Sequence, residues 1–258
     1  MNAPFQAGTA LLLAALAMMP PGAAAETGPV LTLPPADRAA IERALGRGVL
    51  GKPVPAPVIA DPAHYLAFAP GVWTYQIRTG AKGHPAEPYR WSHEGRGEQG
   101  PRWRYDAGGE ETGFVESRAD GVYLTGVREV RDAATTRYAP PEPLLLKGLA
   151  PGQERRQRMK VRVYEDDSPE PVHEGELDVV YRYLGACRLV VPFGSFDAVV
   201  IKSSFAGRVG PAELDDVQYR FFAPGVGTVA LMEKREVSAF VLYNLHLDVG
   251  KVLVARPK

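Results

Sequence analysis

The segment Val217–Val229, VQYRFFAPGVGTV, contains the pattern that decides the fold. Val217, Tyr219 and Phe221 alternate with polar residues, which is the period of a strand with one apolar face. Ala-Pro-Gly-Val-Gly then supplies a turn, because proline fixes φ and the glycine after it allows a positive φ. A second strand pattern, Thr228–Val237, follows directly. The segment therefore predicts two strands joined by a tight turn.

Part of this segment occurs twice in the chain. The motif Tyr-x-x-Phe-Ala-Pro-Gly-Val-x-Thr is found at Tyr65–Thr74 and again at Tyr219–Thr228. The residues that follow the two copies differ completely, which makes a duplicated domain improbable. Each copy precedes an apolar alternating run, so we interpret the motif as one local turn or bulge, used twice to direct the chain into a strand.

The same alternation continues through most of the chain from Tyr65 onward, with glycine, proline or aspartate every ten or so residues. This pattern indicates an antiparallel all-β architecture. The runs that share one face include Trp73/Tyr75/Ile77, Tyr89/Trp91/His93, Trp103/Tyr105, Val161/Val163, Leu177/Val179/Tyr181/Tyr183 and Val241/Tyr243/Leu245.

One helix is expected before these strands. Pro34–Leu45 has prolines at its start, an early acid at Asp37, and apolar residues at helical spacing, and Gly46 or Gly48 would end it. Lys52–Pro62 carries four prolines and reads as an extended connector. We therefore expect residues 26–64 to form the helix and connector, and residues 65–258 to form a single antiparallel β domain.

The first residues predict export. Ala10–Met19 is an uncharged apolar run, and Ala23-Ala24-Ala25 follows as a cleavage site, so residues 1–25 read as a signal peptide. The run is too short to span a bilayer, which needs about 20 apolar residues. Cys187 is the sole cysteine, so no internal disulfide is available. We expect a periplasmic protein that does not span the membrane.

The balance and pattern of charge argue against nucleic acid, an anionic membrane or another polyanion as the partner. Lys plus Arg equals Asp plus Glu at 30 each, so no overall field attracts nucleic acid or an anionic membrane. The basic run Arg155–Arg162 resembles a polyanion site, but the next strand carries Glu174, Glu176 and Asp178 on one face. A hairpin that pairs Arg162 with Glu176 and Lys160 with Asp178 makes a solvated, ion-paired face the better interpretation.

Three stretches carry a resemblance to a group of bacterial envelope proteins. Tyr65–Tyr75 resembles their Tyr-x-Pro-Leu-x-x-Gly-x-x-Trp-x-Tyr opening, with Leu66-Ala67 where Pro-Leu is usual. Val190–Ala198 resembles their V-P-A-G-T-F-D-A turn, with Phe193 in place of Ala, and Tyr219–Val229 resembles a further strand pair. The resemblance implies a fold like that of the lipoprotein carriers LolA and LolB, a curled sheet whose hollow is plugged by helices. It implies fold more than activity.

No residue set has the pattern of an active site. The chain lacks a G-x-S-x-G elbow and an H-E-x-x-H motif, and Ser195 lies in a turn with no base nearby in sequence. The neighbours His173/Glu174/Glu176, His93/Glu94 and His84/Glu87 are weak metal candidates, more typical of solvated residues. Cys187 precedes an apolar strand and reads as a buried, inert thiol. We predict no enzyme, no metal and no cofactor.

Geometry supplies the remaining expectation. About ten strands at ~4.8 Å each form a sheet far wider than one helix of ~10 Å can cover. The sheet must therefore curl into a half-barrel or barrel, which often leaves an apolar hollow. The aromatic rungs would lie side by side near it, either as core or as ligand wall: Trp73, Tyr75, Tyr89, Trp91, Trp103 and Tyr105.

Two functions from different classes follow. The first is a non-enzymatic periplasmic carrier or binding protein for a lipid, acyl chain or other apolar ligand. The second is an envelope assembly or accessory protein, with a fully packed core and sheet edges that bind a protein partner. An open cavity would favour the first, and a filled core the second.

Overall fold

The computed structural model describes residues 28–79, 82–239 and 243–257. The predicted signal peptide, residues 1–25, lies outside the described residues. Within the described part of the chain the elements are α1 (Pro35–Leu45), β1 (Leu50–Val54), α2 (Pro62–Leu66), β2 (Gly71–Thr79), β3 (Lys82–Arg96), β4 (Pro101–Ala107), β5 (Glu111–Arg118), β6 (Gly121–Glu129), β7 (Ala134–Leu146), β8 (Glu154–Glu165), β9 (His173–Val191), β10 (Gly194–Val209), β11 (Ala212–Ala223), β12 (Gly227–Ala239) and β13 (Tyr243–Ala255).

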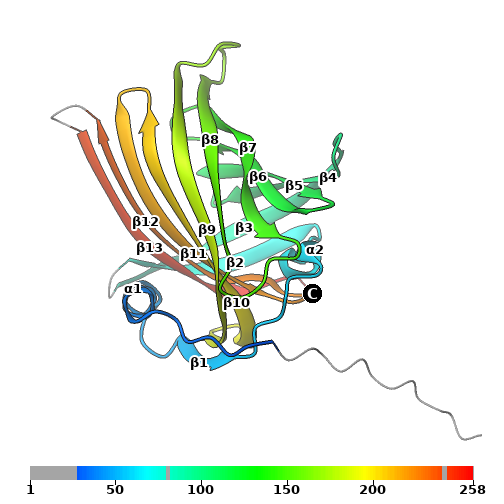
Figure 1. The fold of residues 1–258 in the computed structure, drawn as a ribbon. Helices are drawn as coiled ribbons and strands as arrows, with labels where there is room; N and C mark the ends of the chain where they lie inside the picture. Colours follow the sequence, from blue (N-terminus) through cyan, green and yellow to red (C-terminus); the bar gives the residue numbers. More distant parts are fainter. Residues whose placement is uncertain (1–27, 80–81, 240–242, 258) are drawn as a thin grey trace, which may run out of the picture.

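The strands form one antiparallel sheet that closes on itself. Strands β2 to β13 pair in sequence order from β2 to β8 and again from β9 to β13, and β13 pairs back with β2. The ladder between β8 and β9, from Glu154↔Arg182 to Val163↔His173, completes a 12-stranded barrel. Figure 1 shows the turns of β8–β9 and β10–β11 at one end of this barrel, and α1 with β1 at the other. The prediction of a large curled antiparallel sheet is confirmed.

Strand β9 is long enough to serve two neighbours. Its first half pairs with β8, and its second half pairs with β1 through Leu50↔Leu189 and Val54↔Ala186. A bulge separates the halves, where Gly185 has a φ of +137°. The first residues of the expected connector therefore add a short thirteenth strand to the sheet.

Helix α1 lies on the outer side of the barrel wall. Pro35 occupies its first turn, and Gly46, with a φ of +96°, ends it as the sequence predicts. Ile41 and Leu45 are fully buried, and the helix packs mainly against β12 and β13. A Cβ added to Gly250 of β13 would lie 2.5 Å from the Ala44 carbonyl oxygen, so glycine at this position allows α1 to lie close to β13.

A second helix, α2, was not expected from the sequence. Asp61 caps it by accepting hydrogen bonds from the backbone N–H of Ala63 and His64. Tyr65 and Leu66 are buried in a cluster of side chains from the barrel interior, which includes Leu124, Leu144 and Phe222. Thus α2 fills part of the hollow, while the predicted helix α1 lies outside it.

The two copies of the repeated motif both lead into a strand, β2 and β12, as interpreted from the sequence, but they do so through different local structures. Tyr65 lies in α2, whereas Tyr219 lies in β11 and the Pro-Gly of its copy forms the β11–β12 turn. The difference begins upstream, because Asp61-Pro62 starts a helix and Val217–Phe221 is already a strand. The copies also touch: the Trp73 indole N–H donates to the Val226 carbonyl at 3.3 Å.

The β8–β9 hairpin has the predicted faces but a different register. Arg162 pairs with Glu174 and Lys160 with Glu176, two residues away from the predicted partners. Met159 and Leu177 still lie together on the inner face. A shift by two residues keeps every side chain on its face, so the face pattern alone does not distinguish the two registers.

Candidate functional site: a charged cavity in the barrel

The barrel encloses a cavity of about 340 Å³ between α2 and the end that carries the β10–β11 turn. Its wall has two unlike parts. Strands β8 to β10, together with Leu214 at the start of β11, contribute apolar side chains: Met159, Val161, Leu177, Phe205, Val209 and Leu214. The remaining wall carries tyrosines and charged groups, among them Tyr105, Glu111, Glu129, Glu142, Asp216, Arg220, Glu233, Arg235 and Lys251. The hollow is therefore amphipathic, where the sequence predicts an apolar one.

Strand β11 supplies much of this charge because its inner face is polar. Asp216, Gln218 and Arg220 line the cavity, while Tyr219 between them points outward and donates a hydrogen bond to Asp37 of α1 at 2.7 Å. The Lys202 ammonium also donates to this carboxylate, at 2.7 Å. Strand β11 thus contacts α1 on its outer side and faces the cavity on its inner side.

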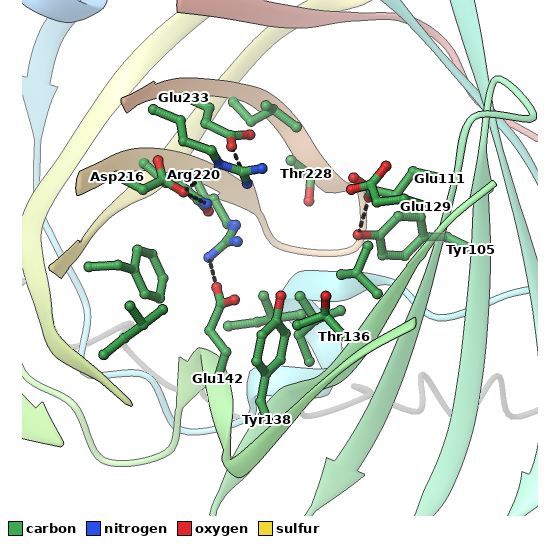
Figure 2. A pocket seen from close by; sticks show the side chains of 18 of the residues that line it. Tyr105, Glu111, Glu129, Thr136, Tyr138, Glu142, Asp216, Arg220, Thr228 and Glu233 are labelled. Carbon is green, nitrogen blue, oxygen red and sulfur yellow. Dashed lines mark hydrogen bonds and ion pairs between the residues drawn. The ribbon is translucent and has the colours of Figure 1, made fainter. Parts of the chain in front are cut away.

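Two arginines of the wall are held by carboxylates. Arg220 lies 2.7 Å from Glu142, whose side chain is 5% exposed. Arg235 lies 3.4 Å from Asp216 and 2.5 Å from Glu233. Figure 2 shows these pairs around the cavity. Buried charges need such partners, because an unpaired one would lose its hydration without compensation.

A third cation, Lys251, is bound by a carboxylate and a tyrosine. Its ammonium lies 2.8 Å from Glu87 and donates a hydrogen bond to the Tyr89 hydroxyl at 2.7 Å. The same nitrogen is 5.1 Å from the centre of the Tyr89 ring, within the range of a cation–π contact.

Glu111 and Glu129 face each other across the β5–β6 ladder. The Tyr105 hydroxyl donates to Glu111 Oε1 at 2.8 Å, and Figure 2 shows Glu129 beside this pair. Burial raises the pKa of Glu111, and burial together with the charge of Glu111 raises the pKa of Glu129. Among the described side chains neither carboxylate forms an ion pair.

Asp216 is the most strongly perturbed acid of the wall. Burial, and then the nearby charge of Glu233, raise its pKa to about 7. Its side chain is 4% exposed, and within the described structure its Oδ1 atom has no hydrogen-bond partner. The other oxygen accepts from Gln218 at 2.7 Å.

The six predicted ligand-wall residues divide into two groups. Tyr75, Tyr89 and Tyr105 line the cavity. The tryptophans belong to the packing around it: Trp73 donates to the Val226 carbonyl at 3.3 Å, and Trp91 and Trp103 pack against Phe68, with ring centroids at 5.6 and 5.0 Å. The rungs do lie side by side, since the Tyr89 and Tyr105 rings stack at 5.6 Å.

The charged residues were the part of the site that sequence analysis missed. Asp216, Gln218 and Arg220 alternate with the apolar residues of β11, but the alternation alone does not show that they face inward. The structure places them inside because α1 covers the opposite, apolar face. In the sequence, the one hint is the helix predicted upstream, because its apolar side could pack on the apolar face of β11.

The other candidate groups lie elsewhere. In the described residues no three His, Cys, Asp or Glu side chains are placed to hold a metal ion. The side chain of His84 lies outside the described residues. Cys187 is buried, as predicted, and burial raises the pKa of its thiol to about 12. Arg158 and Arg162 lie on the outer face and pair with Asp178 and Glu174 at 2.9 and 2.7 Å.

Comparisons with known proteins give two similar structures. No family model and no curated protein matches the chain. One solved structure is a candidate exported protein with a YmcC-like fold from Bacteroides fragilis NCTC 9343, at 11% identity and a TM-score of 0.44, over 76% of this chain and 99% of that one. Another is a candidate lipoprotein from Parabacteroides distasonis ATCC 8503, at 12% identity and a TM-score of 0.37, over 75% and 98%. Neither similarity is close enough to transfer a function.

Neither α1 nor α2 has the length and apolar character of a bilayer-crossing helix, and the same holds for the rest of the described chain.

Proposed function

We propose that this chain is a non-enzymatic periplasmic protein that binds or carries a lipid-like, amphipathic ligand inside its barrel. The observation that carries this proposal is the cavity, in which strands β8 to β10 form an apolar wall and the other strands supply polar and charged groups. Cavities of 300–1,000 Å³ with a few directed polar groups are typical of small-molecule sites. The apolar wall would take the hydrocarbon part of the ligand, and the polar wall its head group.

Within this proposal the tyrosines Tyr75, Tyr89 and Tyr105 contact the ligand, and the tryptophans pack beside these tyrosines. The charged groups mostly hold one another, as in Arg220–Glu142, which suits recognition better than proton transfer. The alternative, a partner-binding protein with a packed core, is less well supported because the core is hollow and the barrel closure leaves few sheet edges. Periplasmic location rests on the predicted signal peptide, and the likeness to LolA and LolB stays a prediction.

The proposal is tested first on the protein purified from its own periplasm. Native mass spectrometry should show a bound species, and organic extraction should release a molecule with a hydrocarbon part. Wild-type protein that carries no such molecule and takes up no apolar fluorescent probe would refute the proposal.

A pair of variants then locates the probe. Val163 lies on the cavity wall and Tyr164 next to it points outward, with Arg137 over its ring at 4.9 Å. Val163→Trp places an indole in the cavity and should weaken probe binding at least tenfold, about 1.4 kcal/mol. Tyr164→Trp places the same indole outside and should leave binding unchanged. Equal effects of the two variants would place the probe elsewhere.

A further inference from the structure

The cavity has more carboxylates than cations. Arg220, Arg235 and Lys251 each pair with carboxylates of the wall, and the described side chains supply no further cation for Glu111 or Glu129. Five carboxylates line the cavity, Glu111, Glu129, Glu142, Asp216 and Glu233, and Glu87 adds a sixth as the partner of Lys251. The wall therefore has an unmatched preference for positive charge.

The structure contains an internal example of how this wall binds an ammonium. Lys251 is held by the carboxylate of Glu87 and the hydroxyl of Tyr89. On the neighbouring strands the same combination recurs as Glu111 and Tyr105, whose ring stacks on Tyr89 at 5.6 Å. The second combination has no ammonium from the described chain. It has an additional carboxylate instead, Glu129.

The placement of Glu111 opposite Glu129 has a cost in stability. Like charges directly opposite in a ladder destabilise a sheet, and burial increases the effect. Local rules of this kind are broken mainly at functional sites, where a ligand or partner compensates. A cation between the two carboxylates would remove the repulsion.

Asp216 gives independent evidence for a donor inside the cavity. This residue lines the same hollow, and its side chain is 4% exposed. Its Oδ1 atom nevertheless has no hydrogen-bond partner within the described structure. A buried acceptor normally has one, so this atom suits an N–H group of a bound molecule.

We propose that the ligand is a cationic amphiphile, with an alkylammonium head group bound by Glu111 and Glu129 and an apolar chain along β8 to β10. This inference rests on the proposed function and names the class of its ligand. Because burial raises the pKa of both glutamates, protons compete with the cation for these carboxylates, and affinity should rise as the pH rises.

The test uses three probes with one chain length: decylammonium, decanoate and decanol, titrated calorimetrically at pH 8. Decylammonium should bind at least about tenfold more tightly than decanoate, with decanol between them. The double variant Glu111→Gln/Glu129→Gln should lose about tenfold in decylammonium affinity and leave decanol unchanged. Glu176→Gln, the same change on the outer face of β9, should alter nothing.

The outcomes separate this inference from the proposed function. If all three probes bind equally, or if the preference for decylammonium survives in the double variant, the assignment of the head group is wrong while the carrier proposal stands. If no probe binds, the carrier proposal fails with it. The double variant should unfold at the same or a higher denaturant concentration, because it removes a like-charge pair. If it does not fold, Glu129→Gln alone provides the same comparison.

Discussion

Tyr219 and Arg220 are adjacent in β11 and lie in opposite environments. Tyr219 packs outward and bonds to Asp37 of α1, while Arg220 points into the barrel and pairs with Glu142. Successive side chains of a strand point to opposite faces, so a single residue step separates the helix contact from the cavity. At the scale of single residues, this strand reverses the usual order of apolar inside and polar outside.

At this scale the β11–β12 turn yields the first prediction. Gly225 has a φ of +67°, and the nearest atom to an added Cβ, in the ring of His64, is 3.6 Å away. The cost of substitution therefore comes from the backbone and not from a clash. Gly225→Val should lower the free energy of unfolding by about 1–3 kcal/mol. Gly225→Asn is the control, because asparagine tolerates a positive φ, and it should cost less. Equal costs in urea unfolding would contradict the backbone explanation.

The two helices act on the barrel from different sides. Helix α1 covers the outer face of β12 and β13, and α2 contributes Leu66 to the cavity wall. The Arg78 guanidinium donates to the Leu45 carbonyl at the end of α1 and so ties this helix to β2. Helix α1 thus supports the wall, and α2 shapes the hollow.

This division predicts that the two helices can be separated by mutation. Ile41 in α1 is fully buried, so Ile41→Ala should cost about 2–5 kcal/mol of unfolding free energy, yet leave apolar-probe affinity within about twofold. Leu66→Ala in α2 enlarges the cavity and should change probe affinity as well as stability. Urea unfolding and probe titration on both variants measure the effects on stability and on affinity separately. A loss of probe affinity in Ile41→Ala would mean that α1 forms part of the site.

The elements also show what the sequence could predict. Alternation identified the strands and the faces of the β8–β9 hairpin, because side-chain period is a local property. The register differs by two residues, since a shift by two preserves the faces and the turn at 166–172 decides between them. Helix α2 escaped notice because it is only five residues long, and its signal is one capping residue, Asp61.

The site was predictable only in part, for a related reason. The tyrosines Tyr75, Tyr89 and Tyr105 were expected near the hollow and line it, because their strands are neighbours in sequence. Asp216 and Arg220 were missed because periodicity shows that a strand has two faces but not which of them is the inner one. That choice depends on where α1 docks, which is a tertiary contact.

Across the whole molecule, inner and outer carboxylates respond to pH in opposite directions. Burial raises the pKa of Asp216, Glu111 and Glu129 inside the barrel. On the outer surface, hydrogen bonds from arginine or lysine lower the pKa of acids such as Glu154 and Asp166. A raised carboxyl pKa stabilises the fold at low pH, and a lowered one stabilises it at high pH. Acid therefore stabilises the fold through the carboxylates inside the barrel. It destabilises the fold through the surface carboxylates only at a pH low enough to protonate them.

The last prediction follows from the raised pKa of Asp216. The folded state holds the proton of Asp216 up to about pH 7, while the unfolded chain releases it near 3.8. The folded state thus binds more protons between these values, and the free energy of unfolding should fall as pH rises from 5 to 7.5. At about 1.4 kcal/mol for each pKa unit, the contribution of Asp216 is at most about 4 kcal/mol. Asp216→Asn should flatten the slope, and Asp215→Asn, at its exposed neighbour, should preserve it. Urea unfolding at four pH values measures all three proteins, and parallel slopes for the two variants would show that Asp216 titrates normally in the folded barrel.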